Sequence, residues 1–104
     1  MKAFLVSDNH DTLVLLNLAG IRGMIARDPA EVRLTVDDVL KNRHDVGVLV
    51  MTERVAEMVP DLVKALRERG EPPLLVEIPD RHGSRRGADF LTRYIRSAIG
   101  VNIE

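Results

Sequence analysis

The chain has 104 residues, no cysteine and a formal net charge of −1. This length predicts one domain, and the lack of cysteine excludes disulfides, thiolate metal sites and a cysteine nucleophile, as suits a reducing cytosol. The near-neutral charge argues against general nucleic-acid binding. No apolar run approaches the roughly 20 residues of a membrane span, and a charge follows the start too soon for a signal peptide, so we expect no membrane insertion.

Short apolar runs bounded by turn-forming residues mark the candidate strands. Such runs are typical of parallel strands that are buried on both faces. The runs cover residues 3–6, 47–51 and 74–78. A weaker candidate at residues 23–27 is expected nearer the edge of the sheet.

Segments whose apolar residues recur at helical spacing lie between these strands. The first helix is predicted over residues 11–19, with Asp11 at its cap and Gly20 after its end, and the second over residues 29–42. A third spans residues 52–69 and should break at Pro60, and a fourth runs over residues 88–99.

This alternation predicts an α/β fold, a four-stranded parallel sheet with alternating helices on both faces. The expected architecture is a three-layer sandwich of receiver or Rossmann type. We expect a single domain over residues 1–104, with a core at about 1–79 and a basic loop and C-terminal helix at about 80–104.

The carboxyl ends of parallel strands are where sites form in such sheets. After the first strand, Asp8, His10 and Asp11 have the side chains of metal ligands. A simpler interpretation makes Asp11 a helix cap and makes Asp8 and Asn9 turn residues.

The chain lacks residues that are essential for two common functions of such folds, phosphoryl acceptance and dinucleotide binding. The third strand ends at Thr52 without a phosphoacceptor carboxylate, and no lysine follows Lys64, so a receiver domain is disfavoured. Residues 7–12 contain no glycine, which removes the dinucleotide fingerprint. Neither His44 nor His82, both expected to be exposed, has a companion nucleophile at a recognisable spacing. We therefore predict no catalytic residue, no cofactor and no metal.

The end of the chain is basic. Residues 1–80 carry 10 Lys and Arg against 14 acids, whereas residues 81–104 carry five Arg against two acids. The loop at 80–87 either holds a phosphate or is simply a flexible basic loop.

The predicted fourth helix allows two interpretations. Its apolar face docks on the sheet and leaves its arginines in water, or the helix and loop offer arginine and aromatic anchors to an acidic partner. The apolar face comprises Phe90, Leu91, Tyr94, Ile95, Ala98 and Ile99. The predicted partner-binding residues are Arg85, Arg86, Phe90, Arg93, Tyr94 and Arg96.

Four stretches in order carry a family resemblance. They are Asp11-Thr12 with Leu18-Ala19-Gly20-Ile21, then residues 50–57 (Val-Met-Thr-Glu-Arg-Val-Ala-Glu), residues 73–79 (Pro-Leu-Leu-Val-Glu-Ile-Pro) and residues 95–101 (Ile-Arg-Ser-Ala-Ile-Gly-Val). Over nearly the whole chain this combination resembles the F subunit of the V/A-type rotary ATPases, which in bacteria is the F subunit of the V-type ATP synthase.

The resemblance implies a non-catalytic central-stalk (rotor) subunit of a proton- or sodium-translocating ATPase or ATP synthase. Such a component would bind the D subunit of the rotor shaft, meet the A and B subunits of the catalytic head transiently and modulate ATP hydrolysis or synthesis. It would be cytoplasmic, in a peripheral complex on the membrane. The alternatives are a standalone receiver-like signalling domain and a small ligand-binding or enzymatic α/β protein that uses Asp8, His10 and the arginine-rich loop.

Overall fold

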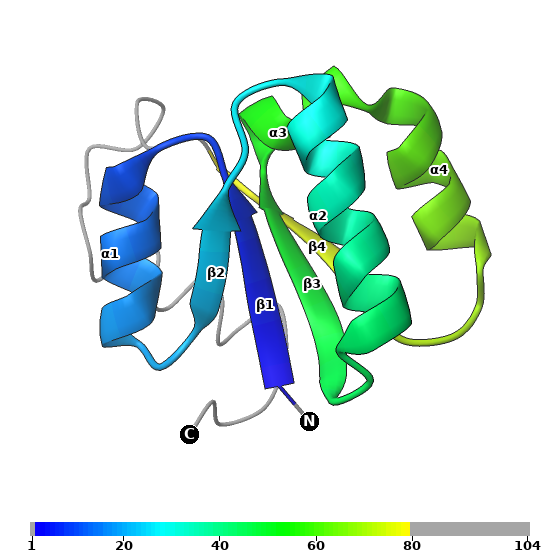
Figure 1. Ribbon diagram of the computed structural model, residues 1–104, viewed down its shortest axis with the longest axis horizontal. Helices are drawn as coiled ribbons and strands as arrows, with labels where there is room; N and C mark the ends of the chain where they lie inside the picture. Colours follow the sequence, from blue (N-terminus) through cyan, green and yellow to red (C-terminus); the bar gives the residue numbers. More distant parts are fainter. Residues whose placement is uncertain (1, 80–104) are drawn as a thin grey trace.

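The computed structural model describes residues 2–79, which form a four-stranded parallel sheet with helices on both faces (Figure 1). The predicted fold class is therefore confirmed. In chain order the elements are β1 (Lys2–Ser7), α1 (His10–Leu18), β2 (Arg22–Ile25), α2 (Pro29–Asn42), β3 (Val46–Thr52), α3 (Glu53–Met58), α4 (Pro60–Glu68) and β4 (Leu74–Ile78). The predicted basic loop and fourth helix lie outside these residues.

The strands lie in the order β2-β1-β3-β4, so β1 and β3 occupy the middle of the sheet. Every residue of β3 is buried, as its unbroken apolar run predicts. The edge position expected for the second strand is confirmed. The burial expected on both faces of the last strand is wrong for Leu74, which is 59% exposed. The reason is that β4 is the other edge strand and pairs only with β3.

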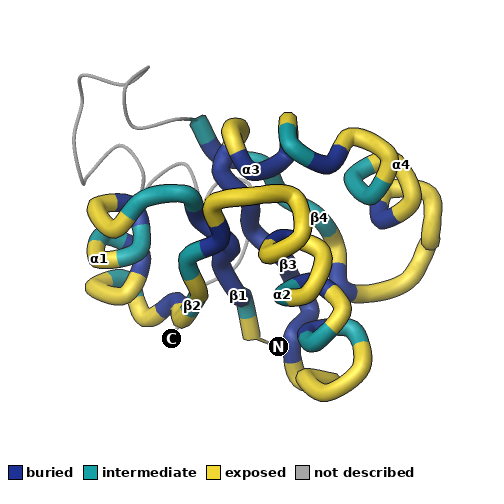
Figure 2. Tube along the Cα trace, turned by 45° about the horizontal axis from the view of Figure 1, so that its top comes forward, coloured by how far each residue is buried: buried dark blue, intermediate teal, exposed yellow. Residues whose placement is uncertain are grey.

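The two faces of the sheet carry separate apolar cores. On one face, α2, α3 and α4 cover a cluster that includes Phe4, Val36 and Leu49. On the other face, α1 contributes Leu16, which joins Leu5 in a second cluster. Figure 2 shows the buried central strands and the exposed outer sides of the helices. Among the described residues, the sheet thus lies between α2, α3 and α4 on one face and α1, which packs on β1 and β2, on the other.

The predicted break at Pro60 is confirmed. Helix α3 ends at Met58, and α4 begins with Pro60 at its first turn, where its missing N–H costs nothing. Thr52 caps α3 as predicted, because its hydroxyl accepts a bond from the backbone N–H of Val55 at 3.4 Å.

The cap predicted for the first helix is wrong. The side chain of Asn9, not Asp11, accepts the backbone N–H of Thr12 at 2.8 Å and starts α1 two residues earlier than Asp11 would. The helix ends at Leu18, and Gly20 follows its end as expected, with a φ of +88° in the left-handed region. The N–H of Ile21 then bonds to the carbonyl of Leu16 at 2.8 Å. This is the bond of a Schellman motif that spans the larger number of residues.

Candidate functional site

The carboxyl ends of β1 and β3 form the position where a doubly wound sheet usually places its site. The helix after β1 packs on one face of the sheet and the helix after β3 packs on the other. The chain winds outward in opposite directions from these two neighbouring strands, and a crevice at their ends is the expected result. Asp8 follows β1 directly, and Thr52 closes β3.

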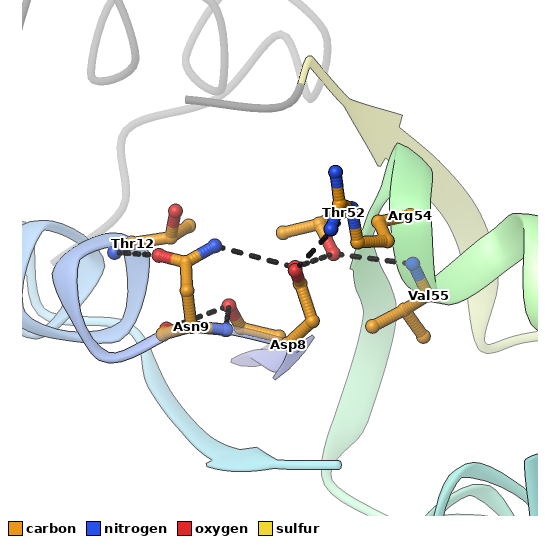
Figure 3. Close-up of polar contacts among 7 residues, drawn as sticks. Asp8, Asn9, Thr12, Thr52, Arg54 and Val55 are labelled. Carbon is orange, nitrogen blue, oxygen red and sulfur yellow. Dashed lines mark hydrogen bonds and ion pairs between the residues drawn. The ribbon is translucent and has the colours of Figure 1, made fainter. Parts of the chain in front are cut away.

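The Asp8 carboxylate is the centre of the polar contacts at this edge (Figure 3). Its Oδ1 accepts a hydrogen bond from the Thr52 hydroxyl at 2.9 Å and one from the Asn9 side-chain amide at 3.2 Å. The Arg54 Nε lies 3.8 Å from the other carboxylate oxygen. The Asp8 side chain is only 14% exposed, whereas that of Arg54 is 60% exposed.

The turn before α1 is held by its own polar side chains. The buried Ser7 hydroxyl donates to the Asn9 carbonyl at 2.9 Å, and its oxygen receives the Asn9 backbone N–H at 3.1 Å. The other end of the Asn9 side chain caps α1 through Thr12. Asn9 therefore links the helix cap to the Asp8 carboxylate. The Thr12 hydroxyl is buried without a hydrogen-bond partner among the residues described.

Together these contacts tie neighbouring strands. The Asp8–Thr52 bond joins residues 44 positions apart, from the ends of β1 and β3. Because Thr52 also caps α3, one hydroxyl connects β1, β3 and α3. The polar groups at the edge are thus bonded to one another, an arrangement that stiffens the sheet.

The metal site considered from sequence does not assemble in the part of the chain that the structure covers. His10 and Asp11 are exposed, and no three His, Asp or Glu side chains within residues 2–79 gather as metal ligands would. His44 is exposed, as expected. What sequence reasoning missed was the approach of Asp8, Thr52 and Arg54, although Asp8 and Thr52 stand at the strand ends where the rule places a site.

The predicted partner-binding residues, the 80–87 loop and His82 lie outside the described residues 2–79. Their role stays a prediction.

Charged pairs on the outer helical layer shift the pKa of several groups. A hydrogen bond from Arg33 on α2 lowers the pKa of Asp61 on α4, and the same contact raises the pKa of Arg33. The Arg33 Nη2 to Asp61 Oδ1 distance is 2.8 Å. The pKa of Asp38 is lowered first by a hydrogen bond from Asn42 and then by one from Arg43. The first pair links α2 to α4, and the second lies within the last turns of α2.

Within residues 2–79, no helix combines the length and the apolar character needed to cross a bilayer.

Comparison with known proteins identifies the family of this chain. The family model of the ATP synthase (F/14-kDa) subunit matches residues 4–95. The A-type ATP synthase F subunit of Methanocaldococcus jannaschii is 31% identical over 104 residues, covering all of both chains. The corresponding F subunit of Pyrococcus abyssi is 32% identical over 108 residues, covering all of this chain and 99% of its own. The family match includes the strand-end edge, both cores and most of the C-terminal segment. The chain therefore belongs to the ATP synthase (F/14-kDa) subunit family.

Proposed function

We propose that this chain is a non-catalytic central-stalk component of a rotary ATPase or ATP synthase, and that it binds the D subunit of the rotor shaft. The observation that carries the proposal is the full-length similarity to the F subunits of A-type ATP synthases. In this role the protein meets the A and B subunits of the catalytic head transiently and modulates ATP hydrolysis or synthesis. It works on the cytoplasmic side of the membrane, within the peripheral part of the complex.

The geometry of the strand-end edge supports a mechanical role. A stalk component has to transmit torque without internal slippage, and torque loads the contacts between strands. The Asp8–Thr52 bond fastens the two central strands at their ends, and the fully buried β3 lies between β1 and β4 in the sheet. Close-packed interiors have low compressibility and transmit strain. A rigid body with contact surfaces is what a coupling component requires.

The test is co-expression of this chain with the shaft protein, the D subunit from the same genome, followed by size-exclusion chromatography. We expect a stable one-to-one complex. Two well-folded proteins that elute separately would refute the shaft-binding role. The family membership would then concern ancestry and fold alone.

The basic C-terminal segment makes a second contact in this proposal. Its arginines would steer and register the interface with an acidic surface of the shaft protein or of the head, while apolar anchors provide most of the affinity. Replacing Arg93 and Arg96 together with Glu is expected to weaken assembly, most strongly at low salt. The measurement is the dissociation constant at two ionic strengths. Unchanged assembly of the double variant would remove these arginines from the interface.

A further inference from the structure

The edge strand β4 is exposed at its start and buried at its carboxyl end. Leu74, Val76 and Ile78 point to the same face of the sheet, because side chains alternate along a strand. Their exposure falls from 59% at Leu74, through a partly buried Val76, to 0% at Ile78. Val76 and Ile78 belong to the apolar cluster on the α1 face. A side chain on an edge strand is fully buried only when atoms outside the sheet lie over it. The carboxyl end of β4 is therefore covered on this face.

Helix α1 is too far from β4 to be the cover. It packs on β1 and β2. Neighbouring strands lie about 4.8 Å apart, so β4, two strands beyond β1, is about 10 Å away from it. A helix with its side chains is about 10 Å wide, so it extends only about 5 Å to each side of its axis. Helices α2, α3 and α4 lie on the opposite face. Within residues 2–79, no helix therefore covers Ile78.

The remaining part of the chain starts at the buried end of β4. Residues 80–104 follow two positions after Ile78, the last residue of the strand. Residues 80–87 contain no apolar side chain, so an apolar cover has to come from beyond them. This link spans up to about 25 Å when extended, which is enough to return the chain over the sheet. The helix predicted over 88–99 has an apolar face, and the middle of that face comprises Leu91, Ile95 and Ala98.

We propose that residues 88–99 dock on the carboxyl end of β4 within the same molecule, with Leu91 and Ile95 packed against Val76 and Ile78. This proposal goes beyond the function proposed above and does not depend on it. The docked segment lies beside α1 on the same face of the sheet. It closes the second apolar core on the side that α1 does not reach.

The proposal selects one of the two interpretations of the predicted fourth helix. The middle of its apolar face belongs to the sheet. At helical spacing, Arg93 and Arg96 lie on the opposite side of the segment from Leu91, so they face away from the sheet. An acidic partner then meets the arginines, while the apolar side chains hold the segment in place.

The experiment uses the absence of cysteine from the full-length chain, because a single introduced thiol then reports the exposure of one position. The rate of thiol labelling of Ile78→Cys is measured under native conditions. Adding Ile95→Asp places a charge on the docked face and is expected to raise this rate at least about ten-fold. Adding Ser97→Asp instead, which places the same charge off that face, is expected to change it less than about two-fold. An unchanged rate with Ile95→Asp would overturn the proposal.

A reporter on the opposite face separates undocking from unfolding. Val36 is 1% exposed beneath α2, and labelling of Val36→Cys should not respond to Ile95→Asp. Equal acceleration at both reporters would mean that the variant unfolds the chain, and a cross-link would then decide. A benzophenone attached to Val76→Cys, in an otherwise unchanged chain, is expected to cross-link to a peptide from residues 88–99 of the same molecule. A cross-link confined to residues 2–79, or one that joins two molecules, would overturn the proposal.

Discussion

The Thr52 hydroxyl offers the sharpest test of how the sheet is held together. It donates to the Asp8 carboxylate at 2.9 Å and accepts the Val55 backbone N–H at 3.4 Å. Thr52→Val replaces this hydroxyl with a methyl group of similar size, so it opens no cavity. The substitution removes the link between β1 and β3 and the cap of α3 at the same time.

The expected loss follows from these two contacts. A lost threonine cap costs about 0.5–2 kcal/mol, and the long Val55 bond favours the lower half of that range. A hydrogen bond to a charged group is worth about 1.5–3 kcal/mol, and here the acceptor side chain is only 14% exposed. Asn9 and Arg54 still contact the Asp8 carboxylate, so we expect a total of about 2–3 kcal/mol. For a domain of about 100 residues this lowers the melting temperature by about 10–20 °C.

The assay is urea unfolding followed by circular dichroism, with the free energy of unfolding taken from the midpoint and slope. Thr52→Ser keeps the hydroxyl and should recover most of the stability. Thr35→Val is the matched control, because the Thr35 hydroxyl bonds only to the Glu31 carbonyl within α2, at 2.9 Å. That variant should stay within about 0.5 kcal/mol of the wild type. A Thr52→Val variant as stable as the wild type, or a serine variant as unstable as the valine one, would refute the reasoning.

Two further predictions concern the edge strand and the outer helices. Gly23→Ala should destabilise the protein by about 1–3 kcal/mol, because the new Cβ would lie 2.4 Å from the Leu5 carbonyl oxygen across the β1–β2 pair; an unchanged urea midpoint would contradict this close approach. The lowered pKa of Asp61 means that its pair with Arg33 stabilises the fold above the ordinary aspartate pKa of about 4 and loses that effect as the pH falls through the lower folded-state value. Asp61→Asn should therefore flatten the acid side of the stability profile, and identical slopes for variant and wild type would count against the pair.

Within residues 2–79, the sequence alone was sufficient for the order and the type of the elements. Unbroken apolar runs marked the central strands, and the proline at position 60 divided the third helical segment where the structure divides it. Gly20 ended the first helix as predicted. These signals are local, because proline and glycine act on the backbone of their own turn and burial on two faces requires apolar residues at successive positions.

The tertiary structure decided which polar groups meet. Asp11 and Asn9 are both good helix caps by residue type, and Asn9 has the position because Ser7 and Asp8 hold its turn at the end of β1. The bond between Asp8 and Thr52 spans 44 positions of sequence and depends on β1 and β3 being neighbours. No pattern within either segment contains that information.

The exposure of individual apolar side chains likewise could not be predicted from the sequence pattern. Leu16 and Leu18 are the same residue type in one apolar helix, yet one is fully buried and the other is 80% exposed. Similarly, Leu74 lies in an apolar strand that proved to be an edge. The apolar pattern determines that these segments fold into helix and strand, but only the packing of the layers determines which of their side chains reach the core and which stay exposed. Burial depends on what lies opposite a side chain, and that neighbour comes from a distant part of the chain.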